Sequence, residues 1–279
     1  MLLQNVSETK IKNIKIFDNW NRREWLWTLL YALLIFFTIP VTRKIQGFIS
    51  ASVGREFFTY YVISVVGCGL AVFLYFFIFK LKIKNISQYV WIVVCAGLYI
   101  YFTVRLRRFP EEATHLIEYG LLSYFVFKAL SHRVHDWTVY ITTILIVSFV
   151  GTIDEFLQWM MPGRYWDFKD VGTNIIGGLI LQLTIWKGIK PDLIKKPLSK
   201  ISVKIFMAVL SIDLIFLGIC LSNTPKAVNS YTAVFKSLLW LRAEEPMSEF
   251  AYPKTAWISI LALLFAVWIF GVKWIKRVK

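Results

Sequence analysis

The sequence has only three cysteines and three histidines among its 279 residues. Cys68, Cys95 and Cys220 stand far apart, within or beside apolar runs, so they form neither a metal-ligand spacing nor a disulfide framework. We interpret them as small packing residues. Acidic residues are also few, 17 against 32 lysines and arginines, and 57% of the chain is hydrophobic. An ordinary soluble domain is excluded, because its apolar residues come in short periodic stretches.

Long runs without charge dominate the chain instead, and the run from Trp25 to Phe37 is the clearest example. A membrane helix requires about 17 to 25 predominantly apolar residues. The sequence therefore predicts an all-α, polytopic transmembrane helical bundle of about eight spans, without a separate soluble domain. Charged residues between Lys10 and Glu24 favour a first membrane helix over a cleavable signal peptide. The expected spans are residues 25–41, 57–79, 88–104, 113–130, 138–160, 170–186, 203–222 and 256–272.

Lysine and arginine are unevenly divided between alternate loops. If the N-terminus is cytoplasmic and the spans alternate, most of the 32 basic residues fall on the cytoplasmic side, as the positive-inside rule requires. Both termini are therefore expected in the cytoplasm. The net charge of +15 is then concentrated on the inner face, where anionic lipid attracts it. The partner that this charge indicates is the lipid bilayer, and no nucleic-acid partner is predicted.

Polar residues are concentrated at the ends of hydrophobic runs between Glu111 and Gly178, on the side that the charge bias places outside. Ionisable groups beside hydrocarbon are costly, so by default they indicate a functional site. On a helix, Glu111, His115 and Glu118 share one face, because they are four and then three residues apart. This segment is the first of three polar faces.

The other two faces follow downstream. Asp154, Glu155 and Gln158 are spaced so that all three can point into one bundle interior. Asp170 and Asn174 are four residues apart and are followed by Gly177-Gly178, whose small size lets a neighbouring helix approach closely. We predict that the three faces converge at one membrane surface. The candidate ligand-binding residues are Glu111, His115, Glu118, Tyr119, Asp154, Glu155, Gln158, Arg164, Asp167, Asp170 and Asn174.

A purely structural role is the alternative interpretation of these residues. The segment Pro162-Gly163-Arg164 is typical of a tight turn, from which Arg164 can pair with Glu155, Asp167 or Asp170. Such pairs would tie three helix ends together without binding any ligand. The density of polar groups beside lipid favours a binding or catalytic site for the set as a whole.

Two segments resemble the signatures of a known family. Residues 110–122, which read Pro-Glu-Glu-Ala-Thr-His-Leu-Ile-Glu-Tyr-Gly-Leu-Leu, are similar to the first signature of the VanZ-like membrane family. Residues 154–178, from Asp-Glu through Pro-Gly-Arg to Gly-Gly, are similar to the second. The resemblance implies an integral protein of the bacterial cytoplasmic membrane. The family's namesake gives resistance to the glycopeptide antibiotic teicoplanin, whereas no biochemical activity comes with the family name.

With this resemblance the chain divides into three parts. Residues 1–24 are expected to form a cytoplasmic segment, and residues 25–187 a VanZ-like membrane core with its signature region at 105–178. Residues 188–279 would then be a two-span extension. Its external loop, residues 223–255, has apolar residues at helical spacing from Tyr231 to Leu239. We expect this amphipathic loop to lie flat in the membrane interface, or else to cover the polar site as a lid.

The first functional hypothesis is an outward-facing polar pocket that binds an amphiphile. The ligand would be a lipid-linked cell-wall precursor or a lipoglycopeptide, and the protein would contribute to teicoplanin resistance without being an enzyme. Arg164 and the group Arg105, Arg107 and Arg108 have the charge to bind phosphate oxygens.

The second hypothesis is an intramembrane hydrolase or transferase that acts on an envelope lipid. His115, Glu118, Glu155 and Asp170 would be its catalytic residues, as general acids and bases. No serine or cysteine nucleophile motif accompanies them. The same side chains have the chemistry to bind a divalent metal. A single histidine beside acids on a helix is more often structural, however, so we predict neither a metal nor a cofactor.

The third hypothesis is a transporter or flippase. Asp213 lies near the middle of the seventh expected span, and an acidic residue there is typical of a proton or ion pathway. The sequence shows neither an inverted repeat nor a pair of broken helices, which are common in transporters. Sequence alone leaves the three hypotheses open.

Overall fold

The computed structural model describes residues 2–80, 82–159, 168–191, 194 and 197–222. Within these ranges every regular element is a helix, as the sequence predicts. The long helices are α1 (Leu2–Val53), α2 (Glu56–Tyr75), α3 (Ile86–Arg105), α4 (Ala113–Leu130), α5 (Thr138–Trp159), α6 (Phe168–Leu183) and α7 (Lys200–Ser222). Three short elements, η1 (Phe76–Lys80), η2 (Pro110–Glu112) and η3 (Thr184–Ile189), extend or precede them.

Among the described residues, five helices are long and apolar enough to cross a membrane. They cover Arg22–Thr42, Glu56–Lys80, Ile86–Arg105, Thr138–Trp159 and Lys200–Gly218. Five of the expected spans therefore coincide with candidate membrane helices. The expected spans 113–130 and 170–186 correspond to α4 and to α6 with η3, which form helices but are not among the five candidates. The span expected at 256–272 and the loop 223–255 lie outside the described residues.

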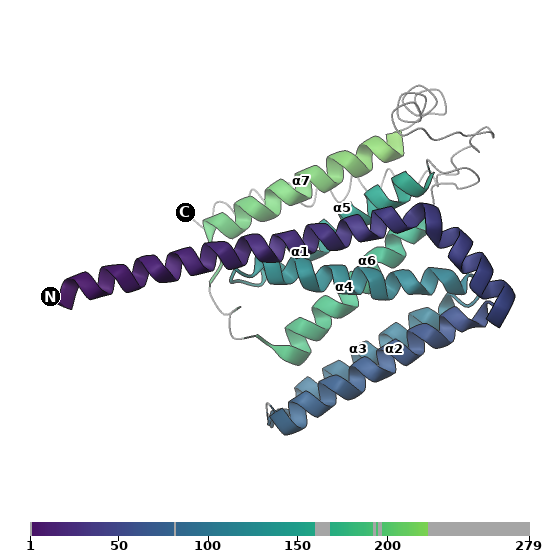
Figure 1. Ribbon diagram of the computed structural model, residues 1–279, viewed down its shortest axis with the longest axis horizontal. Coiled ribbons are helices and arrows are strands. Elements are labelled where there is room, and N and C mark those ends of the chain that lie inside the picture. The colour runs from purple at the N-terminus through teal and green to yellow at the C-terminus, as the bar shows by residue number, and fades with distance from the viewer. Residues whose placement is uncertain (1, 81, 160–167, 192–193, 195–196, 223–279) are drawn as a thin grey trace.

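Helix α4 differs from the candidate spans because it lies at the centre of the described bundle. It packs on α1, α5 and α6 (Figure 1), and its side chains Leu116, Tyr119, Leu122 and Val126 are fully buried. A helix that faces protein on most sides is shielded from lipid and so tolerates polar residues. This position explains how α4 can form a helix where a span is expected although it is not among the five candidate membrane spans.

The remaining helices surround α4. Helix α7 packs on α5, and α2 pairs with α3 in a hairpin that Figure 1 shows beneath the other helices. The turn η3, which continues α6, packs on α3. There the Gln88 side chain donates to the carbonyl oxygen of Gly188 at 2.7 Å, which joins the start of α3 to the end of α6 and η3.

Helix α1 is longer than the expected span 25–41, because it continues through Pro40 to Val53. Proline has no backbone N–H, so the helix loses one internal hydrogen bond there and can bend without ending. Figure 1 shows α1 running along the bundle and then turning toward α2. The part of α1 around Thr38 to Gln46 is thereby brought beside the beginning of α4.

Two close approaches hold the centre of the bundle together. A Cβ added at Gly177 on α6 would lie 2.5 Å from the carbonyl oxygen of Leu116 on α4, so only glycine fits between these helices. This is the close packing that the glycine pair indicates. Beside it, the hydroxyl of Tyr99 on α3 donates to the carbonyl oxygen of Gly177 at 2.7 Å. Helices α3, α4 and α6 are thus joined by direct contacts at Gly177.

Candidate functional site

The end of α5 presents a buried carboxylate to the beginning of α4. Asp154 is 1% exposed, and its Oδ2 accepts hydrogen bonds from the Tyr119 hydroxyl at 2.8 Å and from Gln158 Nε2 at 3.1 Å. Gln158 Nε2 also lies 3.4 Å from Oε1 of Glu155, which is equally buried. The second oxygen of Asp154, Oδ1, has no hydrogen-bond partner in the described part of the chain. Asp154 therefore has one oxygen available to a ligand or water.

His115 lies between two glutamates on the first turns of α4. Its Nε2 is 3.7 Å from a carboxylate oxygen of Glu112, and its Nδ1 is 3.4 Å from a carboxylate oxygen of Glu118. The second contact does not have hydrogen-bond geometry, because Nδ1 is buried and makes no hydrogen bond within the described residues. The trio can hold or move a proton.

Glu111 lies in the short helix η2, ahead of the helix that carries His115 and Glu118, and it forms an ion pair elsewhere. Pro110 begins the short turn η2, and the helix α4 starts only at Ala113. The carboxylate of Glu111 is turned toward the start of α2, where its Oε1 lies 2.6 Å from Nη2 of Arg55. Glu112, not Glu111, stands with His115.

Asn174 on α6 is completely buried, and neither atom of its side-chain amide has a hydrogen-bond partner among the described residues. A Cβ added at Gly151 would lie 3.1 Å from Cβ of Asn174 and 3.4 Å from the Tyr119 ring. Gly151 thus makes room for the amide beside Tyr119. Buried polar groups are nearly always hydrogen-bonded, so an unsatisfied amide is typical of a site that takes up water or a ligand.

A small polar cavity adjoins these residues. It has a volume of about 30 Å³ and is lined by Glu112, His115, Glu118, Asp154 and Gln158. One or two water molecules fit such a space. Its remaining wall comes from α1, with Thr38, Thr42 and Gln46. Sequence reasoning missed this wall, although the spacing of Thr38, Thr42 and Gln46, four residues apart on either side of Pro40, could have indicated a polar face.

The other predicted site residues have different positions. Asp170 is half-buried on the first turn of α6 and is not part of the cavity wall, and neither is Glu155. Arg164 and Asp167 lie outside the described residues. Within the described ranges, no group of three His, Cys, Asp or Glu side chains is placed to hold a metal ion. Asp213, the residue of the transporter hypothesis, is 4% exposed on α7, and its Oδ1 has no hydrogen-bond partner in the described chain.

A larger cleft lies beside the cluster, where α2 begins and α3 ends. Its volume is about 450 Å³, and Arg55, Arg107 and Arg108 line it. Glu56 also lines it, and Arg55 carries the ion pair with Glu111. Arg107 and Arg108 are exposed, and within the described residues neither forms an ion pair. We call this feature the arginine cleft.

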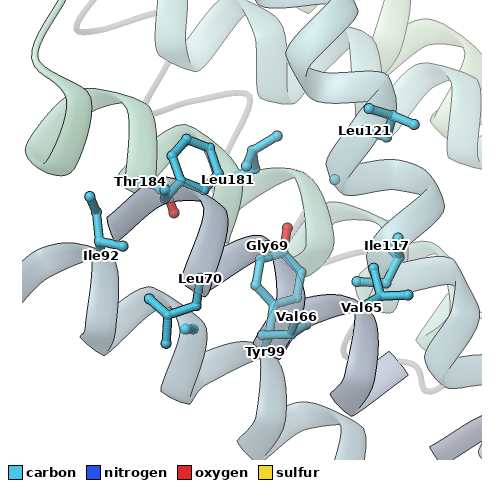
Figure 2. A pocket seen from close by; sticks show the side chains of 13 residues that line it. Val65, Val66, Gly69, Leu70, Ile92, Tyr99, Ile117, Leu121, Leu181 and Thr184 are labelled. Atoms are coloured by element: carbon cyan, nitrogen blue, oxygen red, sulfur yellow. The ribbon is translucent and has the colours of Figure 1, made fainter. Parts of the chain in front are cut away.

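A third cavity is apolar. Figure 2 shows it between α2, α3, α4 and the end of α6, with Gly69, Leu121 and Leu181 among its walls. Its volume is about 310 Å³. The polar cavity is lined mainly by α1, α4 and α5, whereas α2 and α3 contribute to both the arginine cleft and the apolar cavity.

The geometry defines a helical membrane protein with a partly unsatisfied polar site at one end of its bundle. The chain belongs to the VanZ/LLP1 family, because the family's model matches residues 18–190, which is more than half of the chain. The match contains both segments that resemble the family's signatures. No curated protein and no solved structure matches the chain.

Proposed function

We propose that this protein binds the phosphate-bearing headgroup of a lipid-linked envelope intermediate at the outer face of the bacterial cytoplasmic membrane. In this proposal the chain has eight spans and both termini are cytoplasmic, so that the signature end of the bundle faces outward. By analogy with the namesake of its family, the protein would lower susceptibility to teicoplanin. It would do so by occupying or displacing an envelope lipid, without modifying it.

The observation that carries the proposal is the ion pair between Arg55 and Glu111, at 2.6 Å. It joins the arginine cleft to the signature segment, so that a ligand bound in the cleft can act on the polar cluster. Arg107 and Arg108 add two exposed guanidinium groups to the same cleft. Guanidinium groups bind phosphate oxygens through paired, charge-assisted hydrogen bonds.

Size decides which of the two polar spaces receives the headgroup. The polar cavity, at about 30 Å³, has room for water only. The arginine cleft, at about 450 Å³, is within the range of ordinary small-molecule sites. We therefore assign the phosphate to the arginine cleft. The polar cavity then holds water between Asp154, His115 and Gln46 and keeps the adjoining helices in register.

Binding to the purified full-length protein tests the proposal. A polyisoprenyl phosphate is the probe, and the double variant Arg107→Ala, Arg108→Ala should bind it at least about tenfold more weakly, the equivalent of one to two charge-assisted hydrogen bonds. Arg105→Ala is the matched control, because Arg105 is exposed on the same stretch but does not line the cleft. Equal affinity in the double variant and the control would overturn the proposal.

Orientation and phenotype need their own measurements. In intact cells, an impermeant thiol reagent should label Gly163→Cys and not Lys82→Cys; the reverse pattern would place the site in the cytoplasm.

In a susceptible host, expression of the chain should raise the inhibitory concentration of teicoplanin. The double arginine variant should lose this effect at an equal level of protein in the membrane.

A second candidate function, an intramembrane hydrolase or transferase, is favoured by the position of His115 between Glu112 and Glu118. Such a trio can transfer a proton to a leaving group. If the protein is an enzyme, His115→Gln should abolish release of phosphate from the bound lipid while leaving its affinity unchanged. A protein that only binds the lipid should release no phosphate before or after the substitution.

A further inference from the structure

The apolar cavity is lined by α2 and α3, which are two of the candidate membrane spans, together with α4 and the end of α6. Its volume of about 310 Å³ is roughly twice that of an apolar protein cavity known to bind a benzene molecule. Val65, Gly69 and Leu70 form its wall on α2, and Leu121 and Leu181 close it from α4 and α6 (Figure 2). A space of this size and composition suits a hydrocarbon chain.

The polar atoms at the cavity are already used inside the protein. The Tyr99 hydroxyl donates to the carbonyl oxygen of Gly177, and Thr184 Oγ1 donates to the carbonyl oxygen of Ile180 at 2.9 Å. A water molecule or a polar ligand requires two or more hydrogen-bond partners. The Tyr99 and Thr184 hydroxyls do not supply them, because each already donates its proton inside the protein. The cavity therefore selects for an apolar occupant.

The cavity and the arginine cleft are built on the same two helices. Along α2 the cleft residues run from Glu56 to Ile63, and the cavity residues follow from Val65 to Phe73. At about 1.5 Å per residue, Gly69 lies roughly 20 Å along α2 from Glu56, and Phe73 roughly 26 Å. One leaflet of hydrocarbon is only about 15 Å thick. The cavity thus reaches past the middle of the bilayer when measured from the cleft.

We propose that the apolar cavity binds the hydrocarbon chain of the lipid whose phosphate occupies the arginine cleft, and that it selects chains longer than one leaflet. This inference rests on the proposed function. A chain that lies along α2 from the cleft reaches Val65 first and fills the space around Gly69 only if it extends beyond the midplane. The arginines then recognise the phosphate, and the cavity recognises chain length.

Two glycines on α2 make a matched pair of test positions. A Cβ added at either Gly67 or Gly69 would meet nothing within 4 Å, so both positions accept a larger side chain without a backbone clash. Only Gly69 lines the cavity. Gly69→Phe should therefore fill the cavity, whereas Gly67→Phe places the same ring elsewhere on the helix. Leu121→Trp, on α4, fills the cavity from its opposite wall.

The experiment measures the affinity of the full-length protein for isoprenyl phosphates of short and long chain. The wild type should bind the long-chain probe at least about tenfold more tightly, because burial of only two further methylene groups is worth that much. Gly69→Phe and Leu121→Trp should lose this gain with chain length, and Gly67→Phe should keep it. The gain with chain length persisting in both filled variants would overturn the inference.

The arginine variants separate this inference from the proposed function. Arg107→Ala with Arg108→Ala should weaken short-chain and long-chain probes by the same factor, because it removes only the phosphate contact. If the double variant binds every probe as well as the wild type does, the proposed function fails. If Gly69→Phe and Leu121→Trp both retain the preference for long chains while the double variant loses affinity, the chain inference fails alone.

Discussion

Two buried aspartates stand at opposite ends of α5, and their surroundings differ. Asp136 precedes the helix: its Oδ1 accepts from the backbone N–H of Thr138 at 3.1 Å, and its Oδ2 accepts from the backbone N–H of Ser199 at 3.3 Å. Asp154, near the other end, uses Oδ2 twice and leaves Oδ1 without a partner among the described residues. Both side chains are almost completely buried.

The difference separates a structural carboxylate from a functional one. Asp136 joins the start of α5 to the residue before α7, and both of its oxygens are occupied by backbone donors. A carboxylate whose two oxygens both accept hydrogen bonds from the protein in this way stabilises the fold and does not require a ligand. Asp154, together with Asn174 and His115, retains atoms that have no hydrogen-bond partner within the described residues, and such atoms are suited to bind water or a ligand. Burial alone does not distinguish them; the number of occupied acceptor positions does.

The largest expected effect on stability comes from disrupting the packing of α6 against α4, the two helices that carry Asn174 and His115. Gly177→Leu should destabilise the protein by about 3 kcal/mol or more, because the new Cβ would meet the backbone of Leu116 and force α4 and α6 apart. Gly172→Leu, on the same helix, has open space and gains the same helix propensity. Thermal unfolding in detergent compares the two variants. Equal stability would show that α4 and α6 are not closely packed there.

The two aspartates can be compared directly by the same isosteric change. Asp136→Asn should cost about 2 kcal/mol, because an amide has a single oxygen and its NH₂ group would face a backbone N–H. Asp154→Asn should cost less than about 1 kcal/mol, since the amide oxygen can replace Oδ2 and the NH₂ group can occupy the unpartnered side. Denaturant unfolding curves measure both. A larger loss at Asp154 would reverse the assignment of roles.

A smaller effect should follow from removal of one donor to the functional carboxylate. Tyr119→Phe deletes the 2.8 Å hydrogen bond to Asp154 and leaves Gln158 as the remaining donor to Oδ2. The expected loss of stability is about 1 kcal/mol. Tyr31→Phe is the control, since its hydroxyl makes a longer bond, 3.3 Å, to the backbone of Glu118. Unfolding temperatures of the two variants should differ, with Tyr119→Phe the lower.

The smallest expected change in stability is at the ion pair that joins the cleft to the signature segment. The Arg55 side chain is 54% exposed, so Arg55→Ala should cost less than about 1 kcal/mol. Its effect on lipid-phosphate affinity should be larger than its effect on stability and should shrink at high salt. Binding measured at two ionic strengths tests this expectation. If neither the substitution nor salt changes the affinity, Arg55 does not contribute to ligand binding in the cleft.

Within the described residues hydropathy was sufficient to predict that the apolar segments form helices, five of which are long and apolar enough to cross a membrane, because a span needs about 20 apolar residues whatever its neighbours are. The limits of local patterns are visible at Glu111, which helical spacing places with His115 but which belongs to η2 and pairs with Arg55. They are visible again at Pro40, which does not end α1. At Glu111 the deciding contact is with Arg55, which is distant in sequence.

The sequence by itself determined that this chain is a helical membrane protein of the VanZ/LLP1 family and that its polar residues lie near helix ends. These properties depend on composition and on spacing within one helix. Only the tertiary structure decided that α1 supplies a wall of the polar cavity, that the arginines form a cleft, and that both oxygens of Asp136 have partners while Oδ1 of Asp154 has none in the described part of the chain. Hydrogen-bond satisfaction and cavity volume arise between helices, so the pattern along any single helix does not contain them.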